Sequence, residues 1–301
     1  LWISGIKRSL SLSNLLFPFK LFISLIHSSL IIRKFKPDLI IGTGGFASGP
    51  LLQVAAWLNY PTLIQEQNSY PGITNRILGK NVDRICVAFD CMEKFFPQSK
   101  IRITGNPIRD YIVKIKSNKI SKKFFDLDLD KKTLVIIGGS LGSECINNLI
   151  KSELEYIKSF GLQIIWQCGS LYYNKLKSLS SKKVIIKPFI NHIDHLYSAA
   201  DYIISRAGAG SISELSCVAK PSLLIPSPNV SENHQLHNAR VLAKKKAILL
   251  IQEKDLDKKF KAIFSQLVMD KKIQKEMIKN LKSFALPDAT KNIIKEIKDI
   301  L

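Results

Sequence analysis

Glycines and polar side chains gather in one stretch of the sequence, between Asp201 and Gln235. Within it, the apolar run 202–205 predicts a buried strand, and Arg-Ala-Gly-Ala-Gly at 206–210 predicts a turn before a helix over 211–219. Such a turn leaves backbone N–H groups at the start of a helix, where a phosphate or another anion can bind. The alternative is local, because Ser211 and Glu214 stand three residues apart, as in a capping box that serves only the helix.

Two more glycine-rich turns follow apolar runs. A strand predicted over 37–41 is followed by Gly-Thr-Gly-Gly at 42–45, and a strand predicted over 133–137 is followed by Gly-Gly-Ser-Leu-Gly-Ser at 138–143. Glycine permits positive φ and a close approach of the backbone to a ligand. Glu66 lies about 20 residues after the first turn, where a dinucleotide site places a ribose-binding carboxylate. That signal is weak, because the first turn lacks the GxGxxG spacing.

These turns must be positioned by strands and helices, and the sequence alternates between the two. Repeated βα units predict an α/β fold with two doubly wound parallel sheets, ligand loops at the carboxyl ends of the strands and a cleft between the domains. We predict an N-terminal domain over 1–116, a Lys- and Asp-rich linker over 117–132, a second domain over 133–283 and a C-terminal helix over 284–301 that can return to the first domain. The remaining strands are expected at 61–65, 84–89, 101–104, 162–167, 184–187, 222–225 and 247–251.

The composition suits a globular protein with an acidic partner. The 301 residues are 46% apolar, and 45 Lys and Arg against 24 Asp and Glu give a formal net charge of +21. A phosphorylated substrate or an anionic membrane surface fits this charge, although genome composition alone could also produce it. Nucleic acid is not expected, because no zinc-finger, RRM or basic-zipper pattern occurs.

Histidine and cysteine spacing gives little sign of a metal. The five cysteines are scattered without a CxxC pair, which favours a reducing cytoplasm. His192 with His195, and His234 with His237, are each three residues apart and could in principle bind a metal. No carboxylate or thiolate stands near them at metal-site spacing, so we expect no metal.

One apolar segment, 15–32, raises the question of a membrane. Pro18, Lys20, His27 and three serines interrupt it, so a membrane span is not expected. The favoured alternative is a helix whose apolar face packs on the core, and the other is a helix that dips into a membrane interface. That face consists of Leu15, Phe19, Phe22 and Ile26.

Six separated blocks of the sequence carry a resemblance to a known family. They are GTGGFASGP at 42–50, EQNSYPGITNR at 66–76, TGNPIR at 104–109, GGSLGS at 138–143, RAGAGSISE at 206–214 and HQLHNA at 234–239. In this order, and over nearly the whole chain, the sequence resembles the MurG family, which transfers N-acetylglucosamine from UDP-N-acetylglucosamine (UDP-GlcNAc) to lipid I in peptidoglycan synthesis. The resemblance implies a GT-B fold, with two Rossmann-like domains and the active site between them.

The resemblance also implies where the donor binds and that no cofactor is needed. The chemistry fits, because a permanently charged guanidinium and a glycine turn at a helix start suit a diphosphate, while Glu and Gln suit ribose and sugar hydroxyls. Ile190 would hold the uracil through its backbone. Carried over block by block, the contacts are Asn68, Arg109, Ser140, Ile190, Ala209, Gly210, Ser211, Ile212, Ser213, Glu214 and Gln235.

One part of the family pattern is not matched. The family opens with a strand and a glycine-rich loop that contains a histidine suspected of acting as base, and neither occurs in these 301 residues. The resemblance therefore names no catalytic base here, and it implies an incomplete first domain. We expect the chain as numbered to bind the donor and to transfer sugar poorly. Two alternatives stay open: another GT-B transferase, or a non-catalytic basic module that binds membranes or nucleic acid.

Because lipid I is a membrane lipid, the resemblance implies a peripheral protein on the cytoplasmic face of the bacterial cell membrane. An apolar patch beside basic residues gives peripheral binding to anionic lipid. Lys20, Arg33, Lys34 and Lys36 supply the charge. The expected apolar patch consists of Leu16, Phe19, Ile23, Ile26 and Trp57.

Overall fold

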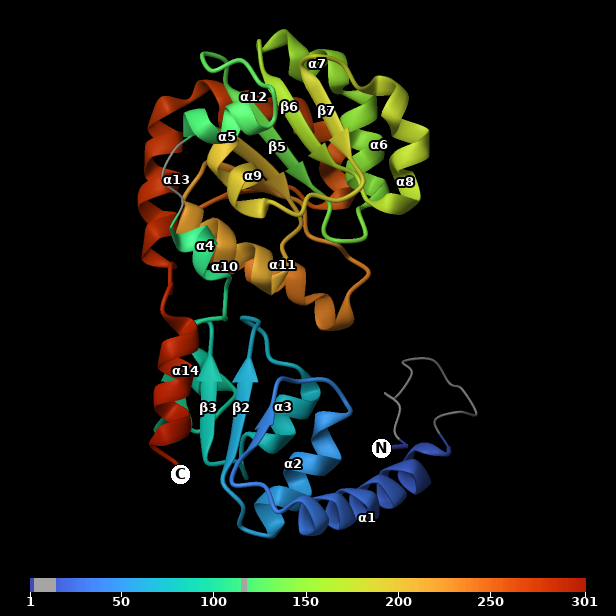
Figure 1. Cartoon of the computed structure of the whole chain (residues 1–301), viewed down its shortest axis with the longest axis vertical. Coiled ribbons are helices and arrows are strands. Elements are labelled where there is room, and N and C mark those ends of the chain that lie inside the picture. The colour runs from blue at the N-terminus through green and yellow to red at the C-terminus, as the bar shows by residue number, and fades with distance from the viewer. Residues whose placement is uncertain (3–14, 115–117) are drawn as a thin grey trace. The chain divides into compact units, whose positions relative to one another are not determined.

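The computed structural model describes residues 1–2, 15–114 and 118–301, and the chain divides into two compact units. Unit 1 comprises Leu1–Asn106 with Asp288–Leu301, and unit 2 comprises Pro107–Pro287. Each unit contains one parallel sheet with helices packed on it (Figure 1). The predicted α/β class with two parallel sheets is confirmed.

A four-stranded parallel sheet in the order β1-β2-β3-β4 forms the centre of unit 1. β2 is buried along its whole length, and Leu52, Ile64 and Ile85 belong to the core around it. The strands are β1 (Ile40–Gly42), β2 (Thr62–Glu66), β3 (Arg84–Val87) and β4 (Ile101–Ile103). The helices are α1 (Phe17–Phe35), α2 (Ser48–Trp57), α3 (Ile73–Leu78) and α14 (Ala289–Lys298), with short 3₁₀ turns at η2 (Met92–Lys94) and η3 (Gln98–Lys100).

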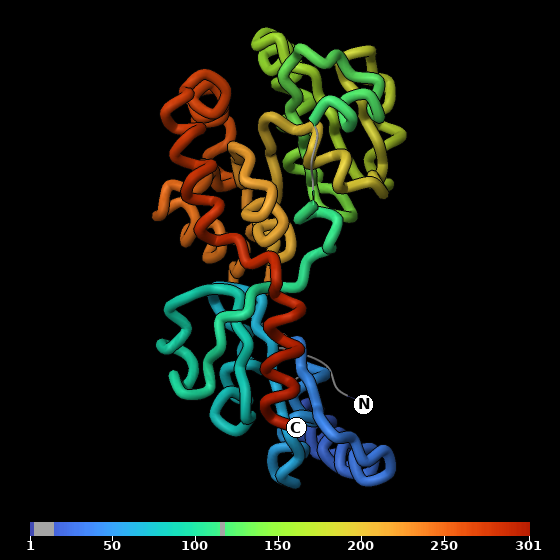
Figure 2. The backbone as a smooth tube through the Cα atoms, turned by 60° about the vertical axis from the view of Figure 1, so that its left-hand side comes forward, coloured from blue at the N-terminus to red at the C-terminus, as the bar shows by residue number. Residues whose placement is uncertain are grey.

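The C-terminal helix α14 is part of unit 1 and lies alongside its strands (Figures 1 and 2). Its Glu296 carboxylate accepts a hydrogen bond from Nε of Arg84 on β3 at 3.2 Å and pairs with Nε of Arg102 on β4 at 3.3 Å. Ala289, the first residue of the helix, is fully buried. The chain therefore returns to the first sheet at its end, as the sequence allowed.

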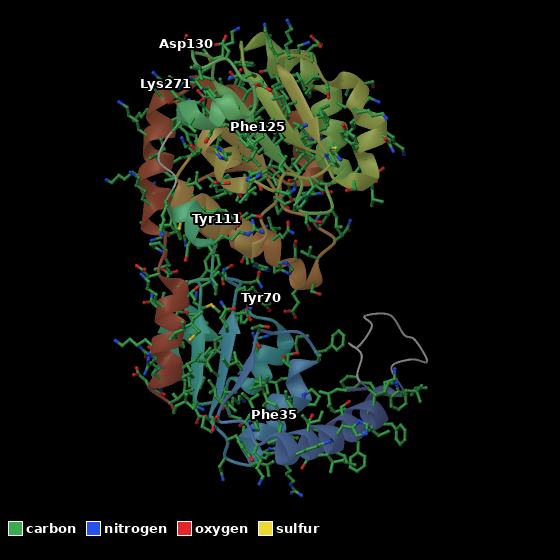
Figure 3. The ribbon with its side chains drawn as sticks, in the orientation of Figure 1. Phe35, Tyr70, Tyr111, Phe125, Asp130 and Lys271 are labelled. Carbon is green, nitrogen blue, oxygen red and sulfur yellow. The ribbon has the colours of Figure 1, made fainter. Side chains whose placement is uncertain are left out.

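Helix α1 buries two serines together with Ile32 and exposes many of its large apolar side chains. Ser24, Ser28 and Ile32 are its buried residues, and the helix packs against α2. The Ser28 hydroxyl donates to the Ser24 carbonyl at 2.7 Å, which satisfies it inside the contact. Phe35, labelled in Figure 3, is 78% exposed at the end of the helix. The interpretation that this apolar face packs on the core is wrong, because these side chains are exposed: Leu15 by 75%, Phe19 by 57%, Phe22 by 61% and Ile26 by 45%.

The described helices include none that is both long enough and apolar enough to cross a membrane.

Unit 2 is built on a six-stranded parallel sheet in the order β10-β9-β8-β5-β6-β7. Central strands β5, β6 and β8 are buried throughout, which their continuous apolar runs predicted. The strands are β5 (Thr133–Ile137), β6 (Gln163–Gln167), β7 (Val184–Lys187), β8 (Tyr202–Ser205), β9 (Ser222–Leu224) and β10 (Leu249–Leu250). The helices are α4 (Asp110–Val113), α5 (Asn118–Phe124), α6 (Glu144–Ser152), α7 (Leu154–Ser159), α8 (Ser170–Leu176), α9 (Ile193–Ala199), α10 (Ala209–Val218), α11 (His234–Lys244), α12 (Leu256–Met269) and α13 (Lys271–Ser283), with 3₁₀ turns at η4 (Lys177–Leu179), η5 (Ser231–Asn233) and η6 (Glu253–Asp255).

The segment predicted as a linker, 117–132, differs from that expectation where the structure describes it. It contains α5, which packs against α9, and it belongs to unit 2. Phe125 and Leu127 are buried, and Lys122 is only 4% exposed. The buried ammonium of Lys122 is satisfied, because it donates to two backbone carbonyls and lies 3.4 Å from Asp201. The charged composition suggested a solvated chain, but its apolar side chains and Lys122 are fixed by contacts that only the folded unit supplies.

Candidate functional site

The turns singled out by the sequence follow the strands of the unit 2 sheet. β5 runs into the turn 138–143, β7 into the loop that contains Ile190, and β8 into the turn before α10. Because all the paired strands of this sheet are parallel, their carboxyl ends lie at the same edge. The segments that carry Ser140, Ile190 and Glu214 are therefore neighbours on one edge of unit 2.

The turn 138–143 meets the loop after β6 backbone to backbone. A Cβ added to Gly142, whose φ is +80°, would lie 2.0 Å from the carbonyl oxygen of Cys168. Glycine is thus the residue that fits here. Ser143, not Ser140, is the N-cap of α6, and its Oγ accepts from the amide of Ile146 at 3.3 Å. Ser140 lies exposed in the middle of the turn that precedes the helix.

Gln167 at the end of β6 joins two of the expected donor segments. Its Nε2 donates to the carbonyl of Gly139 at 3.1 Å, and its Oε1 accepts from the amide of Ile190 at 2.9 Å. The N–H of Ile190 is therefore already bonded inside unit 2. Sequence reasoning missed Gln167, although a polar residue that ends a fully buried strand was the available signal.

The expected run 209–214 forms the first six residues of α10. Gly208 is the N-cap, in an extended conformation with φ −66° and ψ 148°, so the helix begins two residues earlier than the predicted start at Ser211. The capping-box interpretation is therefore wrong, since Ser211 lies within the helix. The Glu214 carboxylate instead accepts a hydrogen bond at Oε2 from the hydroxyl of Tyr197 on α9, at 2.9 Å.

Burial and two neighbours set the charge of Glu214. Burial raises the pKa of this carboxyl, while the hydrogen bond from Tyr197 and the Arg109 guanidinium lower it. Burial raises the pKa of the Tyr197 phenol well above its ordinary value, and the Glu214 carboxylate adds to that shift. Arg109, the exposed N-cap of α4, thus acts electrostatically on both groups. Two residues predicted from separate blocks, Arg109 and Glu214, are brought close together.

Gln235 lines a pocket of about 710 Å³ in unit 2, together with the turn 138–143 and Arg206. Its Oε1 accepts from the amide of Ser227 at 2.9 Å, which orients the side chain at the pocket wall. Ser140, Ile190, Glu214 and Arg109 are not among the residues that line this pocket.

Arg206 opens the block RAGAGSISE at 206–214, and the sequence pattern predicted no contact for its charged side chain. Its Nη1 donates to the carbonyl of Ile225 at 3.0 Å, and its Nη2 donates to Ser143 Oγ and lies 2.6 Å from a Glu253 oxygen. The guanidinium therefore ties the ends of β8 and β9 to the start of α6. Its pairing with Glu253 depends on residues 47 positions apart in the sequence, which no local pattern indicates.

Asn68 lies in unit 1, in a loop organised by Glu66. The Glu66 side chain is 2% exposed and accepts from the Asn68 amide at 2.9 Å, the Asn68 Nδ2 at 3.3 Å, the Gly72 amide at 3.2 Å and the Asn75 Nδ2 at 2.8 Å. Both carboxylate oxygens thus bind the loop itself, which leaves the weak ribose interpretation of Glu66 without support. Tyr70, labelled in Figure 3, belongs to the same loop, and its ring packs against Phe95 and against the guanidinium of Arg76 on α3.

The histidine pairs make local contacts. The His195 ring stacks on Phe124 with ring centroids 4.3 Å apart, and its Nδ1 lies 3.0 Å from Ser121 Oγ. His234 Nδ1 lies 2.8 Å from the carbonyl of Ser231. Over residues 1–2, 15–114 and 118–301, no three His, Cys, Asp or Glu side chains gather in a way that could hold a metal ion.

Comparison with known proteins supports the resemblance at the level of the family. Residues 1–87 match the glycosyltransferase family 28 N-terminal domain, and residues 133–293 match the C-terminal domain of the same family. The chain is 49% identical over 297 residues to a protein of Flavobacterium psychrophilum, covering 98% of this chain and 81% of that protein. It is 50% identical over 302 residues to a protein of Christiangramia forsetii, covering 100% and 82%. Both are named UDP-N-acetylglucosamine–N-acetylmuramyl-(pentapeptide) pyrophosphoryl-undecaprenol N-acetylglucosamine transferase.

Solved structures agree with this assignment. Acinetobacter baumannii MurG superposes with a TM-score of 0.79 and 26% identity, covering 99% of this chain and 83% of that one. A UDP-GlcNAc 2-epimerase from Neisseria meningitidis, with a TM-score of 0.68, 16% identity and coverage of 98% and 84%, shares the fold alone. From the two domain matches, the identities over almost its whole length and the GT-B fold, the chain belongs to the MurG family of glycosyltransferase family 28.

Proposed function

We propose that this protein transfers N-acetylglucosamine from UDP-GlcNAc to the muramyl 4-hydroxyl of lipid I, which makes lipid II for peptidoglycan. The observation that carries this function is the identity of 49% and 50% to transferases of that name over 98% and 100% of the chain. A match of this extent includes both domains rather than one nucleotide-binding module. It therefore favours the transferase over a non-catalytic basic binding module.

The reaction needs stabilisation of a leaving diphosphate. The acceptor hydroxyl attacks C1 of the donor sugar, a new C1–O bond forms with inversion, the bond from C1 to the diphosphate breaks, and UDP leaves. The hydroxyl proton passes to a general base. The turn that contains Ser140, the N–H groups at the start of α10 and the Arg109 guanidinium would stabilise the negative charge that develops on UDP.

The rest of the donor would be bound by the polar groups around that edge of unit 2. Glu214 would accept hydrogen bonds from the ribose hydroxyls, and the backbone of Ile190 would contact the uracil. Gln235, held at the pocket wall by Ser227, would contact the hydroxyls of the transferred sugar. Asn68 stays a donor contact expected from the resemblance, and within unit 1 its side chain donates to Glu66.

Nucleotide selectivity tests the donor. UDP and UDP-GlcNAc are expected to raise the melting temperature of the protein, whereas ADP-glucose is not, because only a ligand of the native state stabilises it. Glu214→Ala should weaken UDP binding by about 1 to 3 kcal/mol, since ribose hydroxyls would lose a partly buried partner. Glu155→Ala, at an exposed carboxylate of α7, is the matched control. Unchanged UDP affinity in folded Glu214→Ala would refute the ribose contact.

Product analysis tests the reaction. With UDP-GlcNAc labelled in the sugar and a water-soluble lipid I analogue, any label transferred is expected on the muramyl 4-hydroxyl, with one UDP released per disaccharide formed. Label on another acceptor would favour a different transferase of the same fold. Release of free N-acetylmannosamine would overturn the assignment. So would an acceptor that stays unlabelled together with a protein that binds no nucleotide.

We further propose that the protein binds anionic membrane surfaces through unit 1, as a peripheral protein on the cytoplasmic face of the cell membrane. Most of the expected patch is exposed, with Leu16 at 52%, Phe19 at 57%, Ile26 at 45% and Trp57 at 61%, while Ile23 is half-buried. Lys20 is half-buried, and the exposed Arg33, Lys34 and Lys36 supply positive charge on or just after α1. Basic residues at an anionic surface contribute about 1 kcal/mol each.

Vesicle flotation tests this surface. Anionic liposomes at low salt are expected to retain the protein, and Phe19→Glu with Trp57→Glu should release it, because two exposed apolar anchors become charged. Met269→Glu, at a 66% exposed methionine of unit 2, is the control and should leave retention unchanged. Equal retention of the double variant and the control would refute the membrane patch.

A further inference from the structure

Tyr197 is a buried tyrosine whose hydroxyl is aimed at the carboxylate expected to bind the ribose. The residue lies on α9, is 2% exposed, and donates to Oε2 of Glu214 at 2.9 Å. The bond connects the helix that follows β7 to the helix that follows β8. No motif of the sequence pointed to Tyr197, because the two residues are 17 positions apart.

We propose that Tyr197 is a positioning residue for nucleotide recognition: by holding Oε2 of Glu214, it fixes the carboxylate so that Oε1 accepts from the ribose hydroxyls. This inference rests on the proposed function, in which Glu214 binds the ribose. A glutamate side chain has several rotatable bonds, and a hydrogen bond to one oxygen removes much of that freedom before the nucleotide arrives. Tyr197 itself is fixed by its burial in unit 2.

The surrounding charges favour the same arrangement. Burial raises the pKa of Glu214, and the Tyr197 hydrogen bond opposes that rise, so the phenol helps to keep the carboxylate ionised. In return, burial and the carboxylate raise the pKa of Tyr197, so the phenol keeps its proton and stays a donor. The protonated phenol is therefore the donor of this bond, and the bond favours the ionised form of the carboxyl.

Other titratable groups around Glu214 come from the elements that pack on α10. Arg109 at the start of α4 lowers the Glu214 pKa, and Cys217 on α10 has its own pKa raised in part by Glu214. The pKa of His237 on α11 is lowered by burial and by Arg240, while Glu232 opposes this shift. The lysines and Glu276 of α13 are not among the groups that shift the Glu214 pKa. Tyr197 is thus the neighbour whose removal should change this carboxyl most directly.

A matched pair of substitutions separates positioning from general packing. Tyr197→Phe removes one hydroxyl and leaves the ring in place. Tyr202→Phe removes the hydroxyl of another buried tyrosine in unit 2. That hydroxyl donates to the backbone carbonyl of Val268 at 3.3 Å rather than to a carboxylate. Affinities for UDP and for 2′,3′-dideoxy-UDP are measured by calorimetry on the full chain from just below pH 4.5, the ordinary pKa of a glutamate carboxyl, to about pH 8.5.

We expect the wild-type protein to prefer UDP over the dideoxy analogue, and Tyr197→Phe to lose roughly tenfold in UDP affinity with the dideoxy affinity nearly unchanged. The acidic limb of the UDP affinity profile should move to higher pH, because the Glu214 pKa loses a group that lowers it. Tyr202→Phe should keep both the preference and the profile. An equal loss for the two nucleotides, or an unmoved acidic limb, would overturn the inference.

The outcomes also separate this inference from the proposed function. If the wild-type protein binds UDP and the dideoxy analogue equally, the ribose contact of Glu214 fails, and the role of Tyr197 fails with it. If the wild-type protein prefers UDP and Tyr197→Phe keeps that preference, only the role of Tyr197 fails. Fluorotyrosine at position 197 preserves the packing and donates more strongly, so it should move the acidic limb to lower pH, and an unmoved limb there would also count against the proposal.

Discussion

At the scale of single residues, Glu214 combines a proposed binding role with a cost in stability. Burial raises the pKa of its carboxyl above the ordinary 4.5, so the folded protein takes up a proton here more readily than the unfolded chain does. The free energy of unfolding should therefore rise as the pH falls from above the raised pKa towards 4.5. The ionised carboxylate costs most above the raised pKa, which is where the proposed ribose contact needs it.

Glu214→Gln tests that cost, because it removes the titration and keeps an oxygen that can accept from Tyr197. We expect its melting temperature to exceed that of the wild-type protein near pH 7, with the difference shrinking as the pH falls towards 4.5. Thermal unfolding over this range measures it. Glu155→Gln, which changes an exposed carboxylate, is the control substitution. A Glu214→Gln difference that grows in acid would contradict the sign derived from burial.

The sequence identifies some of these residues and not others, for a physical reason. Ser140, Glu214 and Gln235 stand in local patterns of glycine, helix start and polar side chain, and their donor contacts remain predictions. Gln167, Arg206 and Tyr197 act through partners on other segments of unit 2, and only the folded unit brings those partners together. The local pattern even misled at Ser211, because the conformation of Gly208 starts the helix earlier.

At the scale of elements, the loops after β5 and β6 are locked by close backbone contact. Gly142→Ala would place a Cβ 2.0 Å from the Cys168 carbonyl at a φ of +80°, so both clash and backbone strain arise. Gly139→Ala is the control, because its φ is +92° but nothing lies within 4 Å of the added Cβ. Strain at positive φ alone costs about 1 to 3 kcal/mol. We expect Gly142→Ala to unfold at lower urea and to bind UDP more weakly than Gly139→Ala, and equal effects of the two would contradict the contact.

Element prediction succeeded where burial was uniform and failed where it depended on a partner. β5 and β8 have the bounds that their apolar runs predicted, since a strand covered on both faces is apolar throughout. The apolar spacing of α1 indicates a helix face but cannot say what covers it. There Ser24 and Ser28 are buried, and most of the large apolar side chains stay exposed. In the same way, the charged composition of α5 gave no indication that this segment forms a packed helix.

At the scale of the whole molecule, the last helix of the chain completes the first unit. Glu296 on α14 is 14% exposed at its side chain and pairs with Arg84 and Arg102, which lie on two neighbouring strands of unit 1. The two units are thus not two consecutive halves of the sequence, since 288–301 folds with 1–106. Sequence patterns could suggest that return but could not assign it, because the contact joins residues 212 positions apart.

Glu296→Gln should therefore loosen unit 1 and leave unit 2 intact. Two guanidinium groups lose their shared carboxylate, and a hydrogen bond to a charged group contributes about 1.5 to 3 kcal/mol. Hydrogen exchange is expected to show faster exchange of the β3 and β4 amides, with β5 and β8 of unit 2 unchanged, because local opening follows local contacts. Asp299→Asn, at an exposed carboxylate just after the same helix, is the control and should change neither unit. Faster exchange in both units to the same extent would mean that α14 stabilises the molecule as one cooperative body, and the assignment of this helix to unit 1 alone would fail.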